Sequence, residues 1–195
     1  MTKPLFPLAE LSDLPEDMKA KILAVQEKAG FVPNVFLALA HRPDEWRAFF
    51  AYHDALMLRD GGPKGLSKAD REMIVTATSA VNHCLYCVVA HGAILRILSK
   101  QPLLADQVAI NYRKAEISAR QQAILDFALK VCQHSHELNA DDVQKLMAHE
   151  LDEEAVWDIV SITAFFGLSN RLANGLGIMP NPEFYTMGRV SKSKA

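Results

Sequence analysis

The stretch that decides the fold and the chemistry of this chain spans residues 67–98 and reads SKADREMIVTATSAVNHCLYCVVAHGAILRIL. It holds a C-x-x-C pair, Cys84 and Cys87. His91 follows the second cysteine by four residues, and Glu72 precedes the first by twelve. Two thiols, an imidazole and a carboxylate can carry out thiol redox chemistry with acid–base assistance. No other part of the chain concentrates such groups so densely, so these four residues are the candidate catalytic site.

The spacing predicts that the two cysteines and His91 share one helical face. At about 100° per residue, the three side chains fall within about 60° of one another. Asn82 is a candidate N-cap that would place both thiols in the first turn, where the helix dipole and free N–H groups favour a thiolate. A break near residues 80–83 would let the preceding helix fold back and aim the Glu72 carboxylate at the pair.

Other interpretations of the same residues stay open. A C-x-x-C pair can be half of a zinc site, but a structural zinc site needs four ligands at suitable spacings, and Cys132 has no partner motif nearby. The two cysteines could also be inert core residues. Likewise, His91 alone could be a core histidine and Glu72 a charge in a first helical turn. Together, the four residues favour redox chemistry without a metal and without a cofactor.

The pattern E-x11-C-x-x-C-x3-H formed by these four residues resembles the active-site signature of AhpD-like alkylhydroperoxidases, in the carboxymuconolactone decarboxylase superfamily. The sequence of residues 79–91, SAVNHCLYCVVAH, is most similar to that of the branch described as peroxidase-related proteins. The resemblance covers most of the chain, is strongest over residues 66–98 and returns at residues 170–173. One position departs from the best-described members, which carry a histidine directly before the second cysteine, where this chain has Tyr86.

The resemblance implies a thiol-dependent (alkyl) hydroperoxide reductase, an antioxidant enzyme whose partners are a hydroperoxide substrate and a dithiol reductant protein or small thiol. In the resembled family the second cysteine attacks the peroxide and the first resolves the product. That makes Cys87 peroxidatic and Cys84 resolving, with Glu72 and His91 as general acid and base. Because His91 lies one turn from Cys87 along a helix, we expect Cys87 to be the more acidic thiol. In thioredoxin-type C-x-x-C helices, however, the first cysteine is the nucleophile.

Two alternative functions use the same scaffold. One is a redox sensor or scaffold protein that has the cysteine pair but no turnover. The other is a decarboxylase or isomerase, although the lactone decarboxylases of the superfamily lack the cysteine pair.

Composition narrows the class of protein. The chain has 195 residues, of which 50% are hydrophobic, enough for one globular domain with a core. A net charge of −2 leaves no electrostatic footprint for nucleic acid. No apolar run reaches the roughly 18 residues of a membrane span, and the first residues lack the apolar region of a signal peptide. We therefore expect a cytoplasmic protein, where a C-x-x-C pair is more often catalytic or metal-binding than structural.

Hydrophobic spacing predicts helices throughout. No segment alternates as a strand does, no glycine occurs between Gly92 and Gly167, and no proline occurs between Pro102 and Pro180. The expected fold is all-α, an AhpD-like helical bundle of roughly nine helices. Two related helical halves would suit that number, but no sequence repeat establishes them. Capping patterns mark four helix starts, at Ser67, Ser118, Asn139 and Asp152.

A single AhpD-like domain is expected over residues 1–195, with an N-terminal arm at 1–14, a motif-bearing core at 43–177 and a C-terminal tail at 180–195 that frays at its end. Apolar surface on the last long helix, around Phe165 and Phe166, suggests packing against another copy. The resemblance implies a homo-oligomer: a dimer, a trimer or a hexamer. We expect His53 to be a core or interface residue and Cys132 an inert core thiol.

Overall fold

The computed structural model describes residues 5–189, and within them it contains ten α-helices, three short 3-10 helices and no β-strand. The all-α prediction is confirmed, and the helix number is close to the expected nine. The α-helices are α1 (Glu16–Ala29), α2 (Asn34–Leu39), α3 (Pro43–Met57), α4 (Lys68–Val81), α5 (Leu85–Ser99), α6 (Leu104–Asn111), α7 (Ala119–His134), α8 (Ala140–Met147), α9 (Glu153–Leu176) and α10 (Glu183–Thr186). The 3-10 helices are η1 (Leu11–Asp13), η2 (Tyr112–Lys114) and η3 (Ser135–Glu137).

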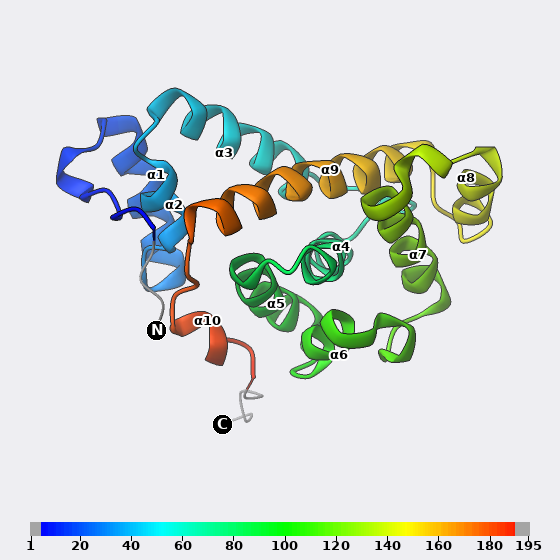
Figure 1. The fold of residues 1–195 in the computed structure, drawn as a ribbon. Coiled ribbons are helices and arrows are strands. Elements are labelled where there is room, and N and C mark those ends of the chain that lie inside the picture. The colour runs from blue at the N-terminus through cyan, green and yellow to red at the C-terminus, as the bar shows by residue number, and fades with distance from the viewer. Residues whose placement is uncertain (1–4, 190–195) are drawn as a thin grey trace.

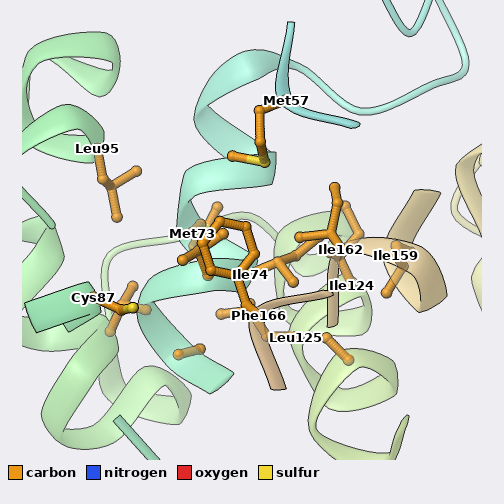
Figure 2. Close-up of a cluster of buried hydrophobic side chains, with 14 of the residues drawn as sticks. Met57, Met73, Ile74, Cys87, Leu95, Ile124, Leu125, Ile159, Ile162 and Phe166 are labelled. Atoms are coloured by element: carbon orange, nitrogen blue, oxygen red, sulfur yellow. The ribbon is translucent and has the colours of Figure 1, made fainter. Parts of the chain in front are cut away.

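The long helix α9 crosses the whole molecule, with α3 along one side and α4, α5 and α7 on the other (Figure 1). Helices α1 and α2 lie at one end of α9, and α8 lies at the other end. Helix α4 is the centre of this arrangement, because every residue from Asp70 to Ser79 is buried. Met73 and Ile74 of α4 lie in the core (Figure 2), and polar residues of the same helix, such as Arg71 and Glu72, are also buried.

The hydrophobic core joins helices that are far apart in the sequence. Figure 2 shows side chains from α3, α5, α7 and α9 converging on those of α4. Cys87 lies at the edge of this cluster, so the candidate site is built on the core. Rigid support of this kind keeps reactive side chains in place.

The capping patterns are present at all four predicted helix starts. Three are reciprocal capping boxes, formed by Ser67 with Asp70, Ser118 with Gln121, and Asn139 with Asp142. At the start of α9, the Asp152 side chain accepts a hydrogen bond from the backbone N–H of Ala155. Each cap satisfies otherwise unpaired N–H groups and contributes about 1 kcal/mol to helix stability.

The C-terminal tail expected from residue 180 is more ordered than a plain tail. Helix α10 packs on α5, and Arg96 donates from Nε to the Met187 carbonyl over 2.8 Å and from Nη2 to the Phe184 carbonyl over 2.7 Å. The two prolines near residue 180 suggested a loop, whereas the buried Phe184 ring and these bonds hold the segment against α5. The expected frayed end at residues 191–195 lies outside the described residues, as do residues 1–4 of the arm.

The packing of another copy around Phe165 and Phe166 stays a prediction. Both rings are buried inside the chain, because α9 is covered by α3 on one side and by α4 and α5 on the other. The large apolar residues that α9 exposes are Trp157, Leu168 and Leu172. Over residues 5–189, none of the helices has the length and apolar character needed to cross a bilayer.

Candidate active site

The site forms where α4 turns back into α5. Helix α4 ends with Asn82 as its C-cap, His83 adopts a left-handed conformation with φ of 52°, and Cys84 is the N-cap of α5. The expectation that Asn82 caps the cysteine helix is therefore wrong. A link this short needs a sharp reversal at His83, so the new helix can begin only at the first cysteine. The Asn82 side chain instead donates to Asn170 Oδ1 of α9 over 2.9 Å.

The reversal makes α4 and α5 neighbours and brings Glu72 to His91, as the break near residues 80–83 predicted. Glu72 Oε2 lies 2.7 Å from His91 Nδ1, and both side chains are buried. The carboxylate holds the ring through Nδ1, which leaves Nε2 for exchange with a reacting group. The edge of the Phe166 ring closes the other side of the imidazole, with ring centroids 4.7 Å apart.

Both thiols of the pair are free and almost fully buried, each with 1% of its surface exposed. Helix α9 supplies polar groups around them. Cys87 Sγ lies 3.8 Å from Ser169 Oγ, and the Asn170 amide lowers the pKa of both thiols. Ser169 and Asn170 have no counterpart in the sequence-based list of site residues. Asn170 begins the stretch at residues 170–173 where the family resemblance returns, and Ser169 beside it is a second polar residue inside the apolar run of the last long helix.

The pKa values of the two thiols are shifted in different directions, whereas the roles expected of the two thiols stay predictions. The pKa of Cys84 is lowered to about 7, first because the Cys87 thiol can donate to a Cys84 thiolate, and further by the Cys87 backbone N–H, Asn170 and the charge of His91. Burial opposes this shift. The Cys84 sulfur makes no capping hydrogen bond of ordinary geometry, so the N–H groups of the first turn act on it through their field.

The pKa of Cys87 is raised, because its proton is shared with Cys84 and because it is buried. We expected an acidic Cys87 because His91 lies one turn away along the same helix. In the structure, the His91 charge contributes to lowering the pKa of Cys84. The direction of its pKa shift and its position at the helix N-terminus, where an anion is favoured, both distinguish Cys84 from Cys87.

Tyr86, which replaces the histidine of the best-described alkylhydroperoxidases, is a packing residue here. Its ring is buried, and burial raises the pKa of its hydroxyl. The ring lies against Phe184 of α10, with centroids 6.4 Å apart. Tyr86 thus connects the cysteine helix to the C-terminal segment.

A histidine that sequence analysis assigned to the core or an interface lies beside the site. The half-buried His53 of α3 has its ring centroid 6.5 Å from that of His91, and Nδ1 of His53 lies 3.0 Å from Asp54 Oδ1. The sequence offered no signal for this proximity, because residues 53 and 91 belong to helices that α9 and α4 bring together.

The third cysteine lies apart from the pair, on α7. Cys132 is half-buried, and its Sγ donates to Asn82 Oδ1 over 3.7 Å. Burial raises the pKa of this thiol. The expectation that it is chemically inert stays a prediction. Among the side chains of residues 5–189, no three His, Cys, Asp or Glu residues are grouped so that they could hold a metal ion.

Comparison with known proteins supports the same family as the signature. The model of the carboxymuconolactone decarboxylase family matches residues 43–131. The crystal structure of a peroxidase-related protein with an alkylhydroperoxidase AhpD core, from Ralstonia eutropha JMP134, is 65% identical, covers 98% of this chain and 100% of its own, and superposes with a TM-score of 0.95. A peroxidase-related protein from Silicibacter sp. TM1040 is 40% identical, covers 97% of this chain and 100% of its own, and has a TM-score of 0.88.

A more distant structure shares the fold alone. The debrominase Bmp8, solved in complex with 2,3,4-tribromopyrrole, is 20% identical, covers 96% of each chain and has a TM-score of 0.74. No curated protein matches the sequence significantly. On the evidence of the 65% identity over nearly its whole length, the chain belongs to the AhpD-like proteins of the carboxymuconolactone decarboxylase superfamily, in their peroxidase-related branch.

Proposed function

We propose that this protein is a thiol-dependent reductase of organic hydroperoxides that uses Cys84 and Cys87 as its redox pair. The observation that carries the proposal is a buried Glu72–His91 pair beside two reduced thiols, one of which has a pKa of about 7. A thiolate at neutral pH supplies the nucleophile, and an oriented imidazole supplies a proton to the leaving group. The apolar wall formed by Phe166 suits an alkyl substituent.

The cycle balances with the groups present and one external reductant. The Cys84 thiolate attacks one peroxide oxygen and breaks the O–O bond, and protonated His91 gives its proton to the departing alkoxide, which leaves as an alcohol. Cys84 is then a sulfenic acid. The Cys87 thiol condenses with it, forming the disulfide and releasing water. A dithiol reductant reduces the disulfide by exchange, which leaves the Cys87 thiol, the Cys84 thiolate and one proton released to solvent, and His91 takes up a proton again from solvent. Because the cycle needs reduced thiols, we place it in the cytoplasm.

We propose that Cys84 attacks the peroxide and that Cys87 resolves the product. The family resemblance assigns attack to Cys87, whereas the lower pKa of Cys84 and its position at the N-terminus of α5 favour Cys84. Reactivity follows the thiolate fraction. Since the two thiols are equally buried, exposure does not favour either one.

The test is single-turnover stopped flow on the fully reduced protein with an organic hydroperoxide. We expect one peroxide consumed for two thiols lost, with the disulfide between Cys84 and Cys87 identified by peptide mapping. If peroxide is not consumed but the pair still becomes oxidised in cells, the redox-sensor alternative replaces the peroxidase. If neither thiol reacts, both the peroxidase and the redox-sensor functions are wrong.

We propose further that copies of the chain associate through the outer face of α9. An apolar groove of about 990 Å³ lies between α2, α3, α9 and the N-terminal arm. Its lining includes Tyr52 and Leu168, whose surfaces are 50% and 52% exposed. An apolar surface of this kind marks a protein–protein interface more often than a solvated face. Multi-angle light scattering at micromolar concentration should give a dimer, trimer or hexamer, and Leu168→Glu should reduce the mass. A monomeric unmodified protein would contradict this proposal.

A further inference from the structure

We infer that His53 and Asp54 form a second imidazole–carboxylate pair that moves protons between solvent and His91. The inference rests on the proposed function and extends it: His53 acts through His91 and not on the thiols, so it is a positioning residue for proton transfer. The pair belongs to α3, whereas the Glu72–His91 pair belongs to α4 and α5. Two histidines, each held by a carboxylate, therefore come from different helices and lie near each other.

The two pairs share the atom through which the imidazole is held. Each imidazole is held through Nδ1 by a carboxylate, His91 by Glu72 over 2.7 Å and His53 by Asp54 over 3.0 Å. Each Nε2 is thereby left as the exchanging atom, and neither Nε2 has a hydrogen-bond partner among residues 5–189. With ring centroids 6.5 Å apart, the two imidazoles do not bond directly. A gap of that size suits one bridging water, which makes a bond of about 2.8 Å to each side.

Exposure increases in steps from the thiols to the surface. Cys84 is 1% exposed, the His91 side chain 11% and the His53 side chain 26%. His53 is therefore the first group of this series with substantial contact with solvent. Phe50, Phe165 and Phe166 surround its ring and offer no alternative polar partner. A proton that reaches His91 through this apolar wall needs a titratable carrier, and His53 is placed to be that carrier.

The charges around His53 keep its partner ionised. The charged or titratable groups that face it are Asp54 on its own helix, Lys21 of α1 through Asp54, and His91 of α5. The pKa of Asp54 is lowered to about 2, first by its hydrogen bond with His53 and then by Lys21. The carboxylate is thus charged at neutral pH, orients the ring through Nδ1, and stabilises the imidazolium that forms during transfer.

The chemistry requires such a route. One proton passes through His91 in each turnover, given to the alkoxide and regained when the disulfide is reduced. If His91 exchanges slowly with solvent, its reprotonation limits the next turnover. A second imidazole that both accepts and donates a proton at Nε2 is suited to this exchange.

The experiment compares His53→Gln with the unmodified protein and with His136→Gln, an exposed histidine far from the site along the chain. We expect His53→Gln to slow steady-state peroxide reduction about tenfold, less than the roughly 10²–10⁴-fold of a direct acid–base group, because water still reaches His91 slowly. Added imidazole should restore the rate, and His136→Gln should have no effect. A rate equal to that of the unmodified protein, or a loss that imidazole does not rescue, would overturn the inference.

A second measurement separates this inference from the proposed function. NMR exchange spectroscopy gives the exchange rate of the His91 ring proton with water in the reduced protein, without any peroxide. We expect His53→Gln to slow that exchange, whether or not the protein reduces peroxides. An unchanged exchange rate contradicts the role of His53, whereas slower exchange together with absent peroxide turnover contradicts only the peroxidase.

Discussion

The two regions that contain cysteines, the α4–α5 link and the end of α7, give the same side chain opposite properties. Cys84 stands at the N-terminus of α5 and has a pKa lowered to about 7. Cys132 stands in the last turn of α7, and burial raises its pKa. The N-terminus of a helix favours an anion and the C-terminus disfavours it. The pKa of a thiol in this protein therefore depends on its position along a helix and on the groups beside it.

The two regions are nevertheless connected. Asn82 accepts from the Cys132 thiol and donates to Asn170, and Asn170 in turn lowers the pKa of Cys84. Both thiols thus lie at the ends of one asparagine pair. The two positions differ because Cys84 has the His91 imidazole and the Cys87 thiol beside it, whereas Cys132 has neither.

The largest effect should come from replacing the thiolate itself. Cys84→Ser should abolish the reaction with hydroperoxide, whereas Cys87→Ser should still react and stall as a sulfenic acid on Cys84. Cys132→Ser should react as the unmodified protein does. Sulfenic-acid labelling with peptide mapping checks all three variants. A label on Cys87 in Cys84→Ser would reverse the roles, and a loss of activity in Cys132→Ser would remove the contrast between the two regions.

The next largest effect should come from the acid–base pair beside Cys84. Glu72→Gln and His91→Ala should each slow peroxide reduction by about 10²–10⁴-fold, the range of general acid–base groups. Glu72→Gln keeps the shape of the side chain, so its thermal midpoint should change little while its rate falls. Stopped flow and thermal unfolding together make the check. If Glu72→Gln lowered the thermal midpoint substantially together with the rate, the pair would have only a structural role.

A smaller effect is expected in the pH dependence of alkylation. Since the pKa of Cys84 is lowered to about 7, its thiolate fraction and its alkylation rate should rise through neutral pH and level off above it. Cys132, with a raised pKa, should react only in more alkaline solution. At pH 7 we expect Cys84 to react about tenfold faster, because the larger thiolate fraction is partly offset by the lower nucleophilicity of an acidic thiol. Iodoacetamide labelling followed by mass spectrometry measures both rates, and equal pH profiles would contradict the comparison.

The smallest effect on activity should come from the asparagine pair. Asn170→Ala removes the donor to Ser79 Oγ and the acceptor for Asn82. Unpaired buried polar groups cost about 1–3 kcal/mol, so the free energy of unfolding should fall by that amount. The pKa of Cys84 should rise, since Asn170 lowers it, and activity at neutral pH should fall several-fold. Urea unfolding and the pH–rate profile check the two effects, and Asn82→Ala, which keeps Asn170 beside Cys84, serves as the matched control.

The helices and their starts could be predicted because they depend on neighbouring residues. The capping boxes at Ser67 and Ser118, the left-handed Gly30 that ends α1, and the long apolar α9 all follow from local spacing and propensity. The four signature residues were found for the same reason. Their fixed spacing is a local pattern, and it also predicted that Glu72 would fold back toward the cysteine helix.

Other features depend on which helices meet, and no local pattern encodes that. The N-cap of α5 is Cys84 and not Asn82, because the reversal at His83 allows the helix to begin only at Cys84. The pKa of Cys84 is lowered first by its hydrogen bond with the Cys87 thiol, and α9, more than eighty residues further along the chain, adds the Asn170 amide.

By itself, the sequence determined an all-α chain with a thiol, imidazole and carboxylate signature at the turn between two helices, since periodicity, capping and spacing act over a few residues. Only the tertiary structure decided that the pKa of Cys84 is lowered, that the rings of His53 and His91 lie near each other, and that α10 returns to cover α5. The physical reason is that electrostatics and packing depend on distances in space, and these are set by long-range contacts between α3, α4, α5, α9 and α10.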